Sequence, residues 1–362
     1  MREAQEFAAG GQETLPRIVA LGGGNGLSTL LKGLRPLYFP AEHGSFSAAE
    51  RARLTAIVTV ADDGGSSGQL RKAYPMLAPG DIRNCLLALA GSDTAWQRLF
   101  DFRFNGQVDS HSLGNLILTA LAQMEDDFTR GIERASALLD VRGQVLPATP
   151  DNIVLEAICT DGTIIRGESS ITQARKAIER VALVPSQIST LPQARAALEQ
   201  AEVIVLGPGS LYTSVIPILL VPGIAAAIAA SRAPVIYAMN LMTEPGETDA
   251  YQPLDFLRAL RRHAPGIHID YVLQNSAPIP QAQRQRYGAN GAGEIPSTAQ
   301  RIPGFSCQPV FRDLFTPLTE SEKIRHDPDK LARAVMDIAR THAEARGEIA
   351  PALAAITELV TP

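Results

Sequence analysis

Cysteine is scarce in this chain, and the cysteines are far apart. The 362 residues include only Cys85, Cys159 and Cys307, without a C-x-x-C pair, and six histidines that lack metal-ligand spacing. This pattern excludes a disulfide framework and gives no sign of structural zinc. It favours a reduced, intracellular protein.

An excess of basic residues is also absent. The chain has 33 Lys and Arg residues against 38 Asp and Glu residues, a net charge of -5 at pH 7. A general nucleic-acid binder would carry a basic footprint, so we expect no nucleic-acid partner. An anionic ligand would have to be held by local backbone amides and a few placed cations.

Long apolar runs are missing as well. The longest, residues 215–230, is broken by Pro217, Pro222 and Gly223. It falls short of the roughly 18 residues that indicate a membrane span. The first 17 residues contain glutamates and no apolar core, unlike a secretory signal. We therefore expect a soluble, cytoplasmic protein without a membrane span.

Strand-like and helix-like segments alternate along most of the chain. Strands are expected over 17–21, 54–60, 234–241 and from 203 and 268, and helices over 27–34, 112–124, 129–140, 191–202, 221–231, 254–263 and from about 81. A β-rich interruption covers about 150–190, with a hairpin signal at Thr160-Asp161-Gly162. The alternation predicts the α/β class: a doubly wound, Rossmann-like, mostly parallel sheet with a small β-rich insertion.

The length fits one large α/β domain or two ordinary ones. We expect a single domain over residues 16–345. A flexible N-terminal tail is expected over residues 1–15, and a C-terminal helix or tail over 346–362.

A glycine-rich turn follows the first expected strand, in "ALGGGNGLSTLLKGL". Its candidate ligand-binding residues are Gly22, Gly23, Gly24, Asn25 and Gly26. A dinucleotide fingerprint would need glycine where Leu27 stands, and Lys32 lies too far along the helix for a phosphate-binding Walker A loop. Glycines let the backbone approach an anion, and the next helix, which opens at Ser28 or earlier, offers free N–H groups. The alternative is a tight strand–helix turn without a ligand.

A second candidate stretch, "TVADDGGSSGQLR", follows the second expected strand. Asp62 and Asp63 stand where α/β proteins bind ligands, and they could hold a magnesium ion or accept bonds from ribose hydroxyls. The residues after them, including Ser66 and Ser67, read as a flexible loop of small hydrogen-bonding groups. The alternative is a solvated Asp-Gly turn that caps a helix.

Two further stretches place polar residues at helix starts. In "APGDIRNCLLALAG", Asp81 is a plausible N-cap, Arg83 could reach a phosphate, and Asn84 stands beside it. In "DSHSLGNLILTAL", His111 and Asn115 flank Gly114. A lone histidine is usually structural, and the sequence offers His111 no obvious triad partner.

A second glycine turn, in "LGPGSLYTSVIPILLVPGI", consists of Gly207, Pro208, Gly209 and Ser210. Its position after a strand makes it a candidate for the other half of a ligand crevice. A third strand end, "MNLMTEPGETD", carries Asn240, Glu244 and Glu247, which could contact a ligand or cap the next helix.

Taken together, these motifs resemble one family. "LGGGNGLSTLLKGL", "LTAIVTVADDGGSSGQLR", "PGDIRNCLLALA", "HSLGNLIL", "GPGSLYTSVIPILLVPGI" and "NLMTEPGETD" resemble, in order, the bacterial gluconeogenesis factors, the YvcK-type proteins. The likeness extends from about residue 17 to residue 340. That family is similar in fold to the CofD-type 2-phospho-L-lactate transferases, but "PGDIRNCLLALA" and "HSLGN" depart from the transferase patterns.

The resemblance implies a cytoplasmic regulatory protein that binds a UDP-sugar, typically UDP-N-acetylglucosamine. It further implies a role in cell shape and wall synthesis during gluconeogenic growth, through a cell-wall synthesis partner that the sequence does not identify. Two positions match family site residues on local context: Tyr287 in "RQRYGANGAGE" and Arg325 in "EKIRHDPDKLA". An aromatic face for a base or sugar and a guanidinium for a diphosphate suit such a ligand.

Alternatives stay open on the sequence. The leading interpretation is ligand binding without catalysis. The alternative is a magnesium-dependent transferase of the 2-phospho-L-lactate transferase type, with Asp62 and Asp63 on the metal. A nicotinamide-dependent oxidoreductase is disfavoured by Leu27. The sequence does not decide the preferred UDP-sugar, or whether the chain forms a homo-oligomer.

Overall fold

A computed structural model describes residues 15–41, 43–91, 94–105, 111–297, 302–316 and 323–347. Its strands are β1 (Ile18–Gly22), β2 (Leu54–Val58), β3 (Gln144–Pro147), β4 (Val154–Cys159), β5 (Ile164–Arg166), β6 (Ile178–Val184), β7 (Val203–Leu206), β8 (Val235–Ala238), β9 (Tyr271–Asn275) and β10 (Gln308–Arg312). The expected terminal tails lie almost entirely outside these described ranges, so they stay predictions.

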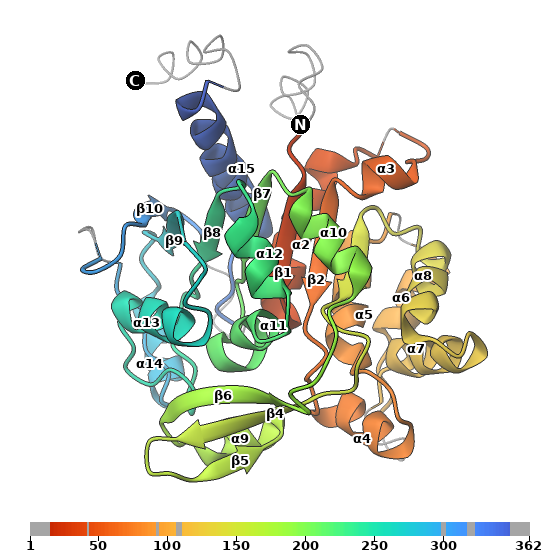
Figure 1. The fold of residues 1–362 in the computed structure, drawn as a ribbon, viewed down its shortest axis with the longest axis horizontal. Helices are drawn as coiled ribbons and strands as arrows, with labels where there is room; N and C mark the ends of the chain where they lie inside the picture. The colour runs from red at the N-terminus through yellow and green to blue at the C-terminus, as the bar shows by residue number, and fades with distance from the viewer. Residues whose placement is uncertain are drawn as a thin grey trace.

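Helices pack around the strands (Figure 1). They are α2 (Gly24–Tyr38), α3 (Ala48–Arg51), α4 (Gly65–Ala73), α5 (Pro79–Leu89), α6 (Ala95–Asp101), α7 (Leu113–Met124), α8 (Phe128–Leu138), α9 (Glu168–Ala174), α10 (Pro192–Glu199), α11 (Ile216–Leu219), α12 (Ile224–Ala230), α13 (Pro253–His263), α14 (Gln281–Gly288) and α15 (Pro328–Ala345), with a π-helical turn, η1 (Leu211–Val215).

The main sheet has seven strands in the order β10-β9-β8-β7-β1-β2-β3, and every pair of neighbours is parallel. The strand order reverses between β1 and β7, because the chain builds outward from β1 in one direction and then from β7 in the other. This reversal is the point where open α/β sheets form a ligand crevice. The predicted doubly wound, mostly parallel fold is confirmed.

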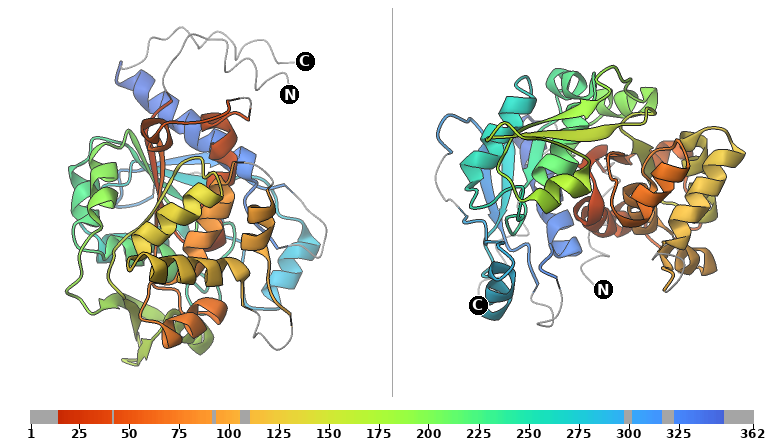
Figure 2. Two further views of the ribbon diagram at one scale, coloured as in Figure 1. Left: turned by 90° about the vertical axis from the view of Figure 1, so that its right-hand side faces the viewer. Right: turned by 90° about the horizontal axis from the view of Figure 1, so that it is seen from below.

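The central strands are buried on both faces, and this explains their unbroken apolar sequences. Along β1, Val19 and Leu21 pack into one core cluster, while Ile18 and Ala20 pack into the other. The first cluster takes residues from α10, α12 and α13, and the second takes residues from α2, α5 and α15. Helices therefore cover both faces of the sheet, as the two views in Figure 2 show.

The β-rich interruption forms a separate antiparallel sheet in the order β5-β4-β6, with α9 between β5 and β6. We call residues 150–190 the insertion. In Figure 1 it lies at the lower end of the molecule, beside α4, which follows the carboxyl end of β2. The predicted hairpin is confirmed as the β4–β5 pair.

One predicted loop differs from the structure. Residues after Asp63, expected to be a flexible loop, form helix α4 from Gly65 onward. The glycine-rich start of α4 packs closely, because a Cβ at Gly68 would lie 1.9 Å from the Asp63 carbonyl oxygen. Ser66, Ser67 and Leu70 of α4 are buried, so tertiary packing overrides the low helix propensity of glycine and serine.

Within the described residues no single helix is both long and apolar enough to span a membrane. The segments Leu211–Leu219 and Ile224–Ala230 pass such a test only as a pair, bent by 73°.

Candidate functional site

The two predicted glycine turns meet at the carboxyl ends of β1 and β7. The Gly207 N–H donates to the Leu21 carbonyl at 2.8 Å. A Cβ on Gly26 would lie 2.3 Å from the Pro208 carbonyl oxygen, so the two turns touch backbone to backbone. Only glycine permits this approach. The structure therefore brings Gly22–Gly26 and Gly207–Ser210 to one place, at the reversal of the sheet.

Helix α2 begins inside the first turn, at Gly24. Its N-cap is Gly23, which supplies no side-chain cap, and its first turn contains no acidic residue. The N–H groups of such an uncapped helix start, together with the helix dipole, favour an anion. One donor is already used, because the Asp81 carboxyl accepts a hydrogen bond from the Gly24 backbone.

Asp81 was predicted as an N-cap, and this prediction is wrong. Helix α5 starts at Pro79 with Ala78 as its N-cap, so Asp81 lies in the first turn with its carboxyl near Gly23. Burial, with a smaller contribution from neighbouring Asp62, raises the pKa of Asp81 to about 7. Its carboxyl therefore lies between the charged and neutral forms near neutral pH.

Asn240 holds the second glycine turn in place. Its Oδ1 accepts the Gly209 N–H at 3.0 Å, and its Nδ2 donates to the Gly209 carbonyl at 3.0 Å. Gly209 and Gly207 have φ values of +157° and +76°, a region that favours glycine. The Asn240 side chain thus contacts the turn directly.

The paired aspartates after β2 point to different partners. Asp62 Oδ1 accepts the Gly64 N–H at 2.8 Å, whereas Asp63 Oδ1 accepts the Ser169 N–H of α9 at 2.9 Å. Asp63 therefore attaches the insertion to the site. The magnesium site suggested for these two carboxylates stays a prediction. Across the described residues, no group of three or more His, Cys, Asp or Glu has a metal-binding arrangement.

Ser66 connects α4 with the start of α7. Its Oγ lies 2.9 Å from His111 Nδ1 and accepts from Asn115 Nδ2 at 3.1 Å and from the Ser112 N–H at 3.4 Å. Because two N–H groups occupy its lone pairs, the hydroxyl proton is left for His111 Nδ1. A neutral His111 then carries its own proton on Nε2. The structure thus gives His111 a serine partner from a distant part of the sequence.

Ser67 lies beside the start of α5, and Arg83 is part of that helix. A Cβ at Gly80 would lie 2.6 Å from Ser67 Oγ and 2.8 Å from Asp62 Oδ2, which places these two side chains together. Arg83 is only 8% exposed and donates from Nη2 to Asn84 Oδ1 at 2.7 Å. Burial and the neighbouring Arg103 lower the pKa of Arg83.

The insertion adds a carboxyl that sequence reasoning missed. Glu168 opens α9 and forms a side-chain hydrogen bond with Asp62. Burial and the negative charge of Asp62 raise the pKa of Glu168 to about 10, so it is protonated at neutral pH. The only sequence signal was an acidic residue at the start of a short helix. Such a residue more commonly stabilises the helix by interacting with its dipole.

Glu244 and Glu247 complete an acidic wall. We use this name for Asp62, Asp81, Glu168, Glu244 and Glu247. Glu247 Oε1 accepts from Thr213 at 3.1 Å and from Thr172 of α9 at 3.4 Å. Burial and neighbouring Glu244 raise the pKa of Glu247 to about 8, and burial raises that of Glu244. The wall is therefore partly neutral at pH 7, although it consists of acids.

Tyr287 and Arg325 lie close to one another, from different segments. Tyr287, in the last turn of α14, accepts the Ile324 N–H on its hydroxyl at 2.8 Å. Arg325, the next residue along, is exposed. Tyr287 thus contacts the backbone next to Arg325, and the ligand-binding roles that the resemblance implies for the two side chains stay predictions.

Comparisons with known proteins agree with this fold. A profile of the CofD family, described as 2-phospho-L-lactate transferase CofD, matches residues 18–314. The gluconeogenesis factor of Halalkalibacterium halodurans is 42% identical over 322 residues, 88% of this chain and 95% of that protein. The gluconeogenesis factor of Bacillus subtilis strain 168 is 40% identical over 325 residues, covering 89% and 98%.

A crystal structure of a Bacillus halodurans protein superimposes with a TM-score of 0.81 at 41% identity. The alignment covers 89% of this chain and 100% of that one. Another Bacillus halodurans structure, described as a member of the UPF0052 family, gives a TM-score of 0.79 at 41% identity, covering 88% and 98%. With its sheet order, its two glycine turns and these relatives, this chain belongs to the CofD family and, within it, to the gluconeogenesis factors.

Proposed function

We propose that this protein binds a UDP-sugar, with UDP-N-acetylglucosamine as the first candidate, and acts as a regulator rather than a catalyst. The observation that carries the proposal is the backbone contact between the Gly22–Gly26 and Gly207–Ser210 turns, next to the uncapped start of α2. Backbone N–H groups at a helix start suit a diphosphate. The diphosphate would lie over these two turns.

The other site residues would contact the rest of the ligand. Asp62 would face ribose or sugar hydroxyls, with Ser66, Ser67, Arg83, Asn84, His111 and Asn115 on the same side of the crevice. Arg325 would supply a guanidinium for the diphosphate. Asn240 would shape the turn that holds the phosphates.

We place this binding in the cytoplasm, where it would report the supply of wall precursor to a cell-wall synthesis protein and so affect cell shape during gluconeogenic growth. The name of the related gluconeogenesis factors supports the link with gluconeogenic growth. A homo-oligomer is compatible with the proposal.

The alternative is a magnesium-dependent transferase of the 2-phospho-L-lactate transferase type, which the description of the CofD family favours. Magnesium would then neutralise charge on a transferring phosphoryl group. Asp62 would be its ligand on this chain, while Asp63 is engaged with Ser169.

Titration calorimetry with UDP-N-acetylglucosamine, with and without magnesium, tests both functions. We expect binding without magnesium and recovery of intact ligand by chromatography. Arg325→Ala should weaken binding by about tenfold to a hundredfold, the range for a lost charged hydrogen bond. Arg333→Ala, an exposed arginine on α15, is the matched control and should bind normally.

Conversion of the ligand, or binding only with magnesium, would support the transferase instead. Absence of binding with UDP-N-acetylglucosamine and UDP-glucose alike would contradict the proposed ligand class.

A further inference from the structure

Arg325 is an exposed cation between two buried residues. Ile324 and His326 are 8% and 9% exposed, whereas Arg325 faces solvent. Nothing in the described ranges forms a hydrogen bond or ion pair with its guanidinium. Ile324 and His326 thus anchor the segment in the protein, while the Arg325 side chain between them stays exposed.

The first anchor of this segment is Tyr287. Its hydroxyl accepts the Ile324 N–H at 2.8 Å, and its ring packs against the core cluster that includes Leu314 and Phe315. The other face of the ring is near Arg286, whose guanidinium carbon lies 5.6 Å from the ring centre. The Tyr287 hydroxyl therefore accepts a hydrogen bond from the backbone just before Arg325.

The second anchor is His326. Its Nε2 lies 3.1 Å from the Met239 carbonyl oxygen. A carbonyl oxygen only accepts, so Nε2 carries the proton and His326 donates. Burial lowers the pKa of His326 to about 4, so the ring stays neutral at physiological pH. The next residue after Met239 is Asn240, which holds Gly209 with two hydrogen bonds.

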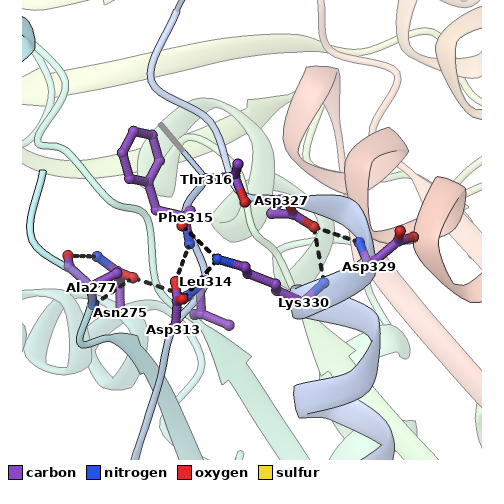
Figure 3. Close-up of polar contacts among 9 residues, drawn as sticks. All are labelled: Asn275, Ala277, Asp313, Leu314, Phe315, Thr316, Asp327, Asp329 and Lys330. Atoms are coloured by element: carbon purple, nitrogen blue, oxygen red, sulfur yellow. Dashed lines mark hydrogen bonds and ion pairs between the residues drawn. The ribbon is translucent and has the colours of Figure 1, made fainter. Parts of the chain in front are cut away.

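A polar network fixes the downstream end of the segment (Figure 3). The Asp327 N–H donates to the Leu314 carbonyl at 2.8 Å, and Thr316 Oγ1 donates to Asp327 Oδ2 at 2.6 Å. Asp327 also caps α15 by accepting the Asp329 and Lys330 N–H groups. Lys330 Nζ in turn donates to Asp313 and to the Phe315 carbonyl, at 2.7 and 3.0 Å.

We infer that Tyr287 and His326 are positioning residues that hold Arg325 at the proposed ligand site and do not themselves touch the ligand. This inference rests on the proposed function. The end of β8 contacts both regions. The Met239 carbonyl accepts a hydrogen bond from His326, and Asn240 holds the Gly207–Ser210 turn. Fixing the chain on both sides of Arg325 lowers the entropy cost of ordering this segment on a ligand.

Single-atom variants separate this role from a direct contact. Tyr287→Phe removes only the hydroxyl and should weaken UDP-N-acetylglucosamine binding roughly fivefold or more, the effect of one net hydrogen bond. His326→Leu should weaken binding to a similar extent. His326→Gln, whose amide can donate from the position of Nε2, should restore it. A variant His326→Gln as weak as His326→Leu would overturn the assignment of His326.

A double-mutant cycle tests whether both residues act through Arg325. In an Arg325→Ala background, Tyr287→Phe and His326→Leu should cause no further loss of affinity, because the group they position is gone. If their effects instead multiply with that of Arg325→Ala, they contact the ligand or act elsewhere, and the inference is wrong.

Hydrogen exchange in the ligand-free protein keeps the inference separate from the proposed function. Tyr287→Phe and His326→Leu should each speed exchange at the Ile324 amide, by roughly tenfold, while amides in the middle of α15 keep their protection. Unchanged Ile324 exchange would overturn the anchors even if the nucleotide binds. A wild-type protein that shows the exchange pattern but binds no UDP-sugar would contradict the proposed function and leave the anchors standing.

Discussion

The candidate site joins a glycine side and an acidic wall that are built in opposite ways. On the side of β1 and β7, short contiguous glycine turns present backbone N–H groups, and Asn240 holds the second turn. The acidic wall collects carboxyls from four separate segments: the end of β2, α5, α9 and the end of β8. The wall touches the glycine side, because the Asp81 carboxyl accepts from the Gly24 backbone. Each glycine turn is a short local segment, whereas the wall exists only because distant segments approach.

This difference has an electrostatic consequence. Backbone N–H groups keep their partial charge at every pH, whereas the wall changes charge near neutrality. Asp81, Glu247 and Glu168 have pKa values raised to about 7, 8 and 10, because burial and neighbouring acids disfavour their charged forms. As neutral acids they donate hydrogen bonds instead of repelling a phosphate. The acidic wall is therefore compatible with an anionic ligand below about pH 7.

The largest effect should come from breaking the glycine side. Gly26→Ala puts a Cβ 2.3 Å from the Pro208 carbonyl oxygen, where backbone must move on both sides. We expect a loss of about 3 kcal/mol in the free energy of unfolding and loss of UDP-sugar binding. Urea unfolding and calorimetry measure the two. Gly44→Ala, where nothing lies within 4 Å, is the control, and an equal loss there would contradict the packing argument.

The acidic wall should make stability depend on pH, and Glu168→Gln tests this. In the unfolded chain a glutamate ionises near pH 4.5, while folded Glu168 keeps its proton to about pH 10. Between these values the unfolded state binds fewer protons, so wild-type stability should fall as pH rises, by at most about 1.4 kcal/mol per pH unit from this group.

Glu168→Gln should remove the part of the slope that comes from Glu168, measured by urea unfolding from pH 5 to 9, while Asp81 and Glu247 still contribute theirs. Exposed Glu199→Gln, on α10, should keep the wild-type slope. A variant Glu168→Gln with an unchanged slope would show that Glu168 is ionised in the folded protein.

The smallest effect should come from detaching the insertion. Asp63→Ala removes the acceptor of the Ser169 N–H, and we expect a loss of about 1–2 kcal/mol in the free energy of unfolding. Hydrogen exchange should speed up in α9 and β5 but not in β1 or β7. Asp337→Ala, whose carboxylate pairs with exposed Arg340 at the surface, is the control. Uniform acceleration over the whole sheet would mean that Asp63 does more than attach the insertion.

Some site residues were predictable because the signal is local. Gly22–Gly26 and Gly207–Ser210 each follow an apolar strand, and parallel strands end at one edge of the sheet. The structure at other positions could not be predicted from a local pattern. The "GGSSG" segment after Asp63 favours a loop by propensity, yet it is helical in α4 because its glycines allow close packing.

Contacts between residues far apart in the chain were also not predictable from local patterns. His111 had no visible partner in the sequence, but Ser66 lies 2.9 Å from its Nδ1. Glu168 belongs to an insertion whose alternation predicts strands and says nothing about contact with Asp62. Such pairs are set by the approach of segments that are about 45 to 105 residues apart, and no periodicity encodes that approach.

The sequence by itself determined the α/β class, five of the seven strands of the main sheet and the two glycine turns, because hydrophobic periodicity and glycine act over a few residues; β3 and β10 were not predicted. The tertiary structure decided which side chains share an environment. It joined Tyr287 to Ile324 and His326 to Met239, gathered five carboxyls into one wall, and by burial raised the pKa values of Asp81, Glu168, Glu244 and Glu247. Hydrogen-bond partners and desolvation depend on three-dimensional proximity, which a local pattern does not contain.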